Sequence, residues 1–316
     1  MNKTRIRLAS LAVGLGVATL ATACPANPGT VPDDTTPTTI VTSTVPVTTS
    51  TTAAPVTTTS TTAAPTTTST TVPATTTTST TIPVTHAPFS RPLVSIEFDD
   101  GYRSQFLLGL PVVQEFGYRP TNYIITDTVK NNASYGSLYM TAAQVKSWAA
   151  VGDIGSHTVT HHSLSGDTPD GKFLTAAQQR AELLDSKTYL TGLLGKAPTL
   201  FATPYCESDD AVTALAKQYY QDMRNCDDPT NTAESWDPYN VHSISIESST
   251  TVAEIKAILA NAKVSKGGVV LVFHDISTVA GQYVTSVAKL RDILQAVKDS
   301  GIAVVSSQQM LNELNG

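Results

Sequence analysis

The folded part of this chain is predicted to be an α/β domain with a parallel sheet, either open or closed into a barrel. Short apolar runs alternate with amphipathic stretches over residues 91–316, and about 226 residues suffice for one domain with a sizeable core. Alternating strands and helices at this spacing are typical of a parallel sheet covered by helices. The predicted strands are Leu93 to Phe98, Asn122 to Ile125, Thr199 to Ala202, Val269 to Phe273 and Ile302 to Val305.

The helix starts are marked by threonines. A threonine followed three residues later by Gln or Glu has the spacing of a capping box, in which each side chain bonds the backbone amide of the other residue. Three such pairs occur: Thr141 with Gln144, Thr175 with Gln178, and Thr251 with Glu254. A one-sided apolar stripe predicts a further amphipathic helix: Val287, Leu290, Ile293, Leu294 and Val297.

Residues 1–24 are predicted to be a secretory signal peptide. Three basic residues precede an apolar stretch from Leu8 to about Ala23, which is too short to be a stable membrane span. The sequence Ala21-Thr22-Ala23 suits an ordinary signal peptidase. The same residues followed by Cys24 suit bacterial lipoprotein processing, with a lipid on Cys24. We prefer the lipoprotein interpretation, and a freely secreted protein is the alternative.

Residues 25–90 are rich in Thr, Pro and Ser and are predicted to form a disordered linker. After Asp34 no Asp, Glu, Lys or Arg appears until Arg91, and large apolar side chains are scarce. Such a composition cannot bury enough surface to offset the entropy lost on ordering the backbone. We therefore expect an extended stalk, open to O-glycosylation, and a protein that is secreted or attached to a bacterial cell envelope.

Charge and composition exclude one class of partner. The net charge is −6, and the predicted domain has no run of Lys or Arg, so nucleic-acid binding is not supported. A neutral or weakly charged polymer is the expected partner. A membrane contact is expected only through the N-terminal lipid, and we assume a monomer.

Three short stretches, each following an apolar run, carry the residues for a metal-assisted reaction. They are Glu97 to Gly101, Ser156 to His161, and Val270 to His274. Two adjacent carboxylates, two histidines four residues apart and a distant histidine are suited to metal-assisted hydrolysis of an acyl group. Alone, Asp-Asp-Gly is usually a turn and a lone histidine usually belongs to the core. Together, at the carboxyl ends of parallel strands, they indicate one site.

These motifs resemble the polysaccharide deacetylase family, also called NodB-like or carbohydrate esterase family 4. The resemblance rests on four motifs in the family's order: Phe98-Asp99-Asp100-Gly101, His157-Thr158-Val159-Thr160-His161, Ala202-Thr203-Pro204-Tyr205 and Val272-Phe273-His274. It extends from Leu93 to about Gln308. It implies that residues 91–316 form the catalytic domain, with an irregular (β/α) barrel of about seven strands.

The resemblance also implies a role for each motif residue. Asp100, His157 and His161 would hold one divalent metal ion, for which zinc is expected and cobalt, nickel or iron are alternatives. Asp99 would be the general base and His274 the general acid. Tyr205 would donate its backbone N–H to the oxyanion and help to bind the substrate.

Two positions depart from the family pattern. The Arg that usually pairs with the catalytic base is Ala202 here, and Arg224 is our candidate to replace it; an ordinary surface or structural ion pair is the alternative. Cys206 stands where the family usually has Gly. In an oxidising compartment Cys206 and Cys226 would form a disulfide, leaving Cys24 available for a lipid.

Trp236 is a candidate for substrate binding, because an indole can stack on a sugar face; ordinary core packing is the alternative. The expected function is removal of acetyl groups, most of all N-acetyl groups, from a polysaccharide such as a chitin-type, poly-GlcNAc or peptidoglycan glycan. Two alternatives stay open. One is an acetylxylan esterase or a hydrolase of small amides or imides. The other is a non-catalytic glycan-binding module, which Ala202 favours.

Overall fold

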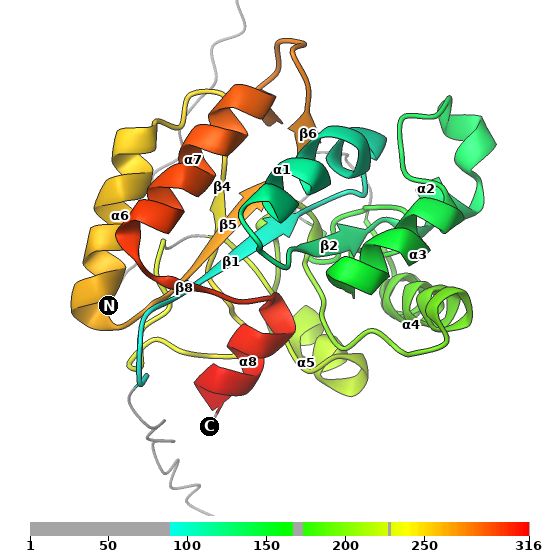
Figure 1. Ribbon diagram of the computed structural model, residues 1–316. Coiled ribbons are helices and arrows are strands. Elements are labelled where there is room, and N and C mark those ends of the chain that lie inside the picture. Colours follow the sequence, from blue (N-terminus) through cyan, green and yellow to red (C-terminus); the bar gives the residue numbers. More distant parts are fainter. Residues whose placement is uncertain (1–88, 167–172, 227–228, 316) are drawn as a thin grey trace, which may run out of the picture. The chain divides into compact units, whose positions relative to one another are not determined.

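The computed structural model describes residues 89–166, 173–226 and 229–315 (Figure 1). All of them belong to the second of the two units into which the chain divides, residues 78–316. The predicted signal peptide, Cys24 and the linker up to residue 88 lie outside the described residues, so these three assignments stay predictions. No helix in the described part of the chain is long and apolar enough to cross a membrane.

A parallel sheet lies at the centre of the domain (Figure 1). Its strands follow the order β3 (Asp153–Ser156), β2 (Thr121–Ile124), β1 (Leu93–Phe98), β5 (Gly268–Phe273) and β4 (Ile244–Ser245), and β8 (Ala303–Val304) also pairs with β1. The pairing of β1 with β5 runs unbroken from Leu93 and Gly268 to Phe98 and Phe273. The residues after these two strands therefore emerge side by side.

Three parallel bridges close the sheet into a barrel. Ser156 at the end of β3 pairs with Phe201, Ala202 pairs with Arg224, and Arg224 pairs with Val241, which leads directly into β4. Five strands and the two bridging segments around Ala202 and Arg224 thus form one closed path of seven. The predicted irregular (β/α) barrel is confirmed. Its irregular side is the one where single bridges replace a continuous ladder.

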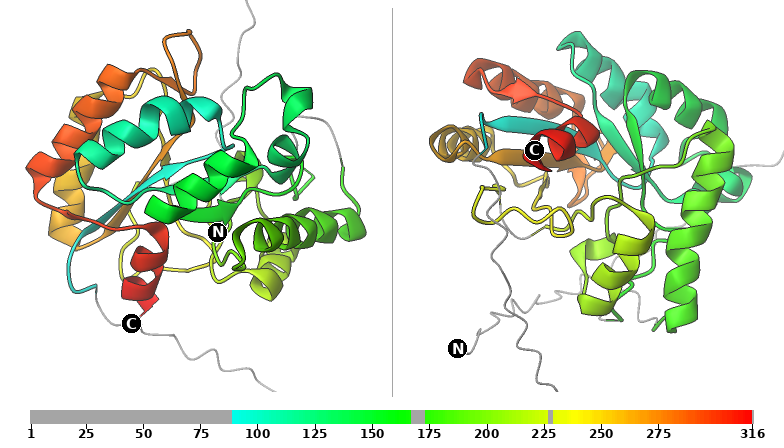
Figure 2. Two further views of the ribbon diagram at one scale, coloured as in Figure 1. Left: turned by 45° about the vertical axis from the view of Figure 1, so that its right-hand side comes forward. Right: turned by 90° about the horizontal axis from the view of Figure 1, so that it is seen from below.

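Helices surround this sheet (Figures 1 and 2). They are α1 (Leu110–Glu115), α2 (Thr126–Lys130), α3 (Ala142–Val151), α4 (Ala176–Leu194), α5 (Asp210–Tyr219), α6 (Val252–Ser265), α7 (Val287–Ser300) and α8 (Ser307–Asn315). The short strands β6 (Asp275–Ile276) and β7 (Val284–Thr285) pair with each other. All three predicted capping boxes are confirmed, at the starts of α3, α4 and α6.

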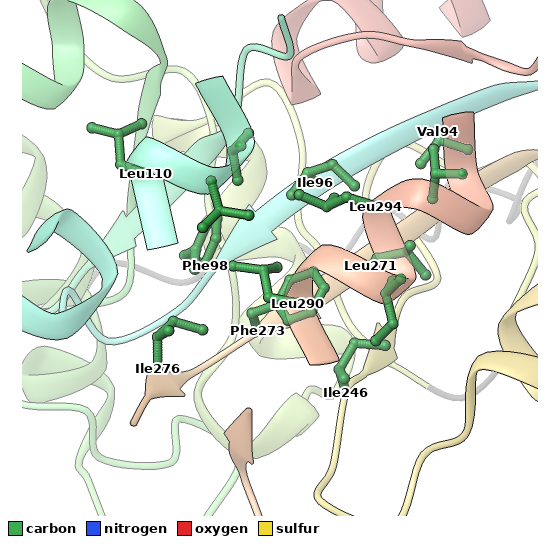
Figure 3. Close-up of a cluster of buried hydrophobic side chains, with 14 of the residues drawn as sticks. Val94, Ile96, Phe98, Leu110, Ile246, Leu271, Phe273, Ile276, Leu290 and Leu294 are labelled. Carbon is green, nitrogen blue, oxygen red and sulfur yellow. The ribbon is translucent and has the colours of Figure 1, made fainter. Parts of the chain in front are cut away.

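Alternation along β1 separates an apolar face from a polar one. Val94, Ile96 and Phe98 pack toward α7 in the largest buried cluster, which Figure 3 shows in close-up. Since successive strand residues point to opposite faces, Ser95 and Glu97 lie on the other face, toward the barrel interior. Both are fully buried polar residues. The barrel interior is therefore the place where polar side chains below the site must find partners.

A pair of glycine substitutions tests how tightly β3 is packed. A Cβ added to Gly152 would overlap the carbonyl oxygen of Pro120 and lie 2.7 Å from Nε1 of Trp148, whereas one added to Gly192 in α4 meets nothing within 4 Å. We expect Gly152→Ala to lower the free energy of unfolding by about 1–3 kcal/mol. The control Gly192→Ala should raise it by about 0.5–1 kcal/mol. Urea denaturation measures both, and equal shifts would contradict this packing.

Candidate active site

Three side chains form one face of a candidate metal site. Nε2 of His157 and Nε2 of His161 are 3.1 Å apart, and they lie 3.6 and 3.5 Å from Oδ1 of Asp100. A tetrahedral zinc ion with ligands at about 2.0–2.2 Å holds those ligands about 3.3–3.6 Å from one another. The three predicted ligands are therefore brought together at a suitable spacing.

The electrostatic environments of Asp100 and His157 also favour binding of a cation. Oδ1 of Asp100 is buried and has no hydrogen-bond partner among the residues that the structure describes. Burial raises the pKa of Asp100 to about 8, with a further contribution from the charge of Asp99. A bound cation would supply the missing partner and favour the carboxylate. Burial lowers the pKa of His157 to about 4, so its imidazole is neutral, the form that binds metals.

Local backbone geometry aims these ligands at one point. Asp100 and His161 follow β1 and β3 with φ values of 74° and 64°, in the left-handed region that side-chain-bearing residues seldom adopt. Nδ1 of His157 lies 2.8 Å from the carbonyl oxygen of Ala202. Because a carbonyl can only accept, Nδ1 carries the proton and Nε2 keeps its lone pair for the site.

Asp99 lies beside this face and is held by Arg224. Nη2 of Arg224 donates to both carboxylate oxygens, at 2.6 Å to Oδ1 and 2.5 Å to Oδ2. Burial acts to raise the pKa of Asp99, but the charges of Arg224, His157 and His274 outweigh it and the pKa is lowered. Arg224, the predicted replacement for the family's arginine, thus contacts Asp99, the predicted base. It does so from a segment that pairs with Ala202. Arg224 is only 2% exposed, so a surface ion pair is excluded.

Glu97 also contacts Arg224, and the sequence reasoning missed it. Oε2 of Glu97 lies 3.1 Å from Nε of Arg224, an ion pair without hydrogen-bond alignment. Oε1 accepts a 2.7 Å hydrogen bond from the hydroxyl of Ser307, the first residue of α8. Burial raises the pKa of Glu97, and Arg224 opposes that effect. A single carboxylate inside a buried apolar strand was the available signal, since such a group needs a partner.

His274 completes the group on the far side of Asp99. Its Nε2 lies 3.9 Å from Oδ2 of Asp99, which in turn is 4.0 Å from Nε2 of His157. Burial lowers the pKa of His274, while the charge of Asp99 acts to raise it. These groups share a cavity of about 310 Å³ that also reaches Tyr205 and Tyr283. The cavity provides room for a small acyl group beside both the metal face and His274.

The prediction that Trp236 binds substrate is wrong. Trp236 is 5% exposed and packs edge-on against Phe89, with ring centroids 6.0 Å apart. Its Nε1 donates a 2.9 Å hydrogen bond to Asn315, and it shares a buried cluster with Leu93, at the end of β1 opposite to Asp99. The large apolar indole of Trp236 is stabilised by burial in the core, and it is not available to stack on a sugar. The exposed aromatic rings that line the cavity are Tyr205 and Tyr283, and the ring of Tyr283 lies 5.1 Å from that of His274.

The predicted disulfide between Cys206 and Cys226 is present, with Cα atoms 5.4 Å apart. Cys206 ends a short 3₁₀ turn in which Tyr205 has a φ of 57°, and the Tyr205 ring lies 4.6 Å from that of His161. The disulfide links this turn to the segment that carries Arg224. The role of the Tyr205 backbone N–H as an oxyanion donor stays a prediction.

The barrel and its site define a class: an α/β protein with a candidate hydrolytic metal centre at the carboxyl ends of its strands. Residues 86–223, less than half of the chain, match the family model described as polysaccharide deacetylase. The resemblance predicted from the motifs is confirmed. The match ends before Arg224 and His274, so the assignments of these two residues rest on geometry.

Individual relatives are distant. YxkH of Bacillus subtilis (strain 168), a protein assigned provisionally as a polysaccharide deacetylase, is 29% identical over 134 residues, which are 42% of this chain and 44% of that protein. The chain thus matches less than half the length of this relative.

Two solved structures are similar at lower identity. The Xyl-CE4 domain of a multidomain xylanase from the hindgut metagenome of Trinervitermes trinervoides is 18% identical with a TM-score of 0.48, covering 70% of this chain and 90% of that one. For the peptidoglycan deacetylase PdaC from Bacillus subtilis the identity is 16% and the TM-score 0.45, covering 72% and 93%. TM-scores below 0.5 carry no conclusion about activity.

Removing Arg224 tests the buried charge group. Arg224→Ala would leave Asp99 and Glu97 buried without their cation, and we expect the free energy of unfolding to fall by about 3–5 kcal/mol. The control is Arg291→Ala, which breaks the exposed 2.8 Å ion pair with Glu115 and should cost at most about 1 kcal/mol. Urea denaturation compares the two variants. An Arg224→Ala variant as stable as the control, with unchanged activity and pH profile, would contradict the assignment.

Proposed function

We propose that this protein is a metal-dependent hydrolase that removes acetyl groups, N-acetyl groups above all, from a polysaccharide. The observation that carries the proposal is the cavity in which a three-ligand metal face, Asp99 and His274 lie side by side. The family match over residues 86–223 supports the same reaction class.

Asp99 would act as the general base. A divalent ion held by Asp100, His157 and His161 would, when bound, polarise the acetyl carbonyl and lower the pKa of water. Asp99 lies beside that face and would accept the proton of the attacking water. Arg224 keeps the carboxylate ionised and fixes its orientation, because one nitrogen donates to both of its oxygens.

His274 would act as the general acid on the other side of Asp99. Burial lowers its pKa, so a protonated imidazole here gives up its proton readily to the leaving nitrogen or oxygen. The backbone N–H of Tyr205 would stabilise the oxyanion that forms on the carbonyl oxygen. Positioning of the base, the acid and the oxyanion donor around one cavity would contribute through orientation as well as through proton transfer.

The proposed substrates are neutral or weakly charged glycans that carry N-acetyl groups, such as chitin-type, poly-GlcNAc or peptidoglycan strands. Zinc is the proposed metal, since two imidazoles and one carboxylate suit it, and cobalt, nickel or iron would also fit this donor set. A non-catalytic module loses its main support, because Arg224 supplies the cation that Ala202 lacks.

We further propose that the enzyme works outside the cytoplasm, tethered by a lipid on Cys24 and held off the membrane by the Thr-rich linker. Expression in a bacterial host with labelled palmitate would test this. Wild-type protein should carry the label and sediment with membranes, whereas Cys24→Ser should lose both properties. Retention of Cys24→Ser in the membrane fraction would discard the lipid anchor.

The reaction itself is tested by acetate release from chitooligosaccharides, peptidoglycan and acetylxylan. Zinc-loaded protein should release acetate from at least one of them, and a chelator should abolish the release. Asp99→Asn should lower kcat by about 10²–10⁴-fold, because the base is lost. The bound metal content should stay unchanged, since Asp99 is not one of the three ligands. No acetate from any of these polymers would refute the proposal.

A further inference from the structure

We propose that Glu182 is a positioning residue that fixes the shape of the loop 157–161 and so sets the affinity of the metal site. The inference rests on the proposed metal-dependent function, but its test reads metal binding and not acetate release. Glu182 lies in the second turn of α4, outside all of the motifs that pointed to the site, and is half-buried.

The loop needs an outside support because its backbone is irregular. Thr158 and His161 have φ values of 65° and 64°, in the left-handed region, and neither is a glycine. Residues held in such conformations persist only where surrounding contacts determine them. Inside the loop itself, the hydroxyl of Thr158 accepts a 3.0 Å hydrogen bond from the amide of His161. The next two amides, those of Val159 and Thr160, point to α4.

Glu182 binds both of these amides. Its Oε2 accepts hydrogen bonds of 2.8 Å from the amide of Val159 and 2.9 Å from the amide of Thr160. Its Oε1 accepts a 2.7 Å bond from the hydroxyl of Thr160. Three donors, from two of the three residues between the metal-binding histidines, meet one carboxylate, and a charged acceptor fixes the loop more strongly than neutral acceptors would.

The carbonyl groups of the loop are held from the opposite direction by the start of α2. The amide of Thr126 donates to the carbonyl of Thr158 at 3.1 Å, and the amide of Asp127 donates to the carbonyl of Val159 at 2.9 Å. Val159 is thus bonded on both sides, by α2 through its carbonyl and by Glu182 through its amide. Without Glu182, only one of these two supports remains.

Two neighbours of Glu182 on α4 continue the same contact. Gln179 and Ser186 are three positions before and four positions after it, which places all three on one side of the helix. The Ser186 hydroxyl lies 2.7 Å from that of Ser156, and Nε2 of Gln179 donates to the carbonyl of Leu164 at 2.5 Å. This polar side of α4 therefore forms hydrogen bonds to the chain before, within and after the metal-binding loop.

Zinc affinity measured by competition with a chelating dye tests the proposal. Glu182→Gln removes the charge and part of the hydrogen bonding, and we expect the Kd for zinc to rise about 10–100-fold, the usual effect of losing a group that orients metal ligands. Glu182→Asp keeps the charge but shortens the side chain by one methylene, so it should weaken binding in the same way. Glu182→Asp with the wild-type Kd would mean that charge alone matters and would overturn the proposal.

The matched control is Glu254→Gln. Glu254 also accepts a backbone amide and a hydroxyl bond, both from Thr251, but at the start of α6 and away from the site. The Glu254→Gln variant should bind zinc with a Kd within about twofold of wild type. The free energy of unfolding of the metal-free protein should fall by a similar amount in Glu254→Gln and in Glu182→Gln. Equal Kd values for the two variants would overturn the proposal.

Thr160→Val covers the case in which Glu182→Gln does not fold. It removes only the hydroxyl bond to Oε1 of Glu182 and should raise the Kd for zinc about threefold, because one of three donors is lost. An unchanged Kd in Thr160→Val would count against the proposal. Failure of acetate release in the wild-type protein would refute the proposed function and leave these zinc affinities as they are.

Discussion

The guanidinium of Arg224, buried between two carboxylates, is the constraint on which the site and the barrel both depend. Its side chain pairs with Asp99 and Glu97, while its backbone forms the bridges to Ala202 and Val241 that close the sheet. A buried cation is tolerated where opposite charges lie against it. A bond from Nη1 to Ser243 and the ring of Tyr123 below the guanidinium, 5.1 Å away, complete that environment.

The site consists of two halves with separate supports. The proposed metal half is built from Asp100 and the loop 157–161, which α2 and α4 hold from opposite sides. The proposed proton-transfer half is built from Asp99 and His274, with Asp99 held from inside the barrel by Arg224. The halves meet at Asp99 and Asp100, because neighbouring residues at the end of one strand face different partners. The Cys206–Cys226 disulfide adds a covalent link between the Tyr205 turn and the Arg224 segment.

Features that depend on short stretches of sequence could be predicted. The capping boxes, the apolar stripe of α7 and the motifs at strand ends follow from local periodicity and chemistry. Arg224 could be proposed because the family motif lacks a cation at Ala202 and a buried base needs one. The strand predicted at 199–202 is reduced to single bridges, and β8 is shorter than predicted, because pairing across the barrel decides strand length.

Features that depend on distant partners could not be predicted. An indole can pack in a core or stack on a ligand, and only the presence of Phe89 and Asn315 decided the case of Trp236. Glu182 looks like an ordinary helix residue, since its partners lie 22 and 23 positions earlier in the chain. Glu97 lies in a strand that was predicted correctly. The sequence pattern did not predict that the segment of its partner, Arg224, lies next to that strand.

The contact between Glu97 and Ser307 has a consequence for the order in which the domain assembles. The two residues are 210 positions apart, and Arg224 and Asp99 are 125 apart. Contacts between such distant residues close large loops and are slow to form. Strand β1 therefore carries the Glu97 carboxylate long before its partners are made: the cation of Arg224 follows later in the chain, and the hydroxyl of Ser307 comes only with α8. A nascent chain that stops short of α8 would contain β1 with part of its polar interior still exposed to water.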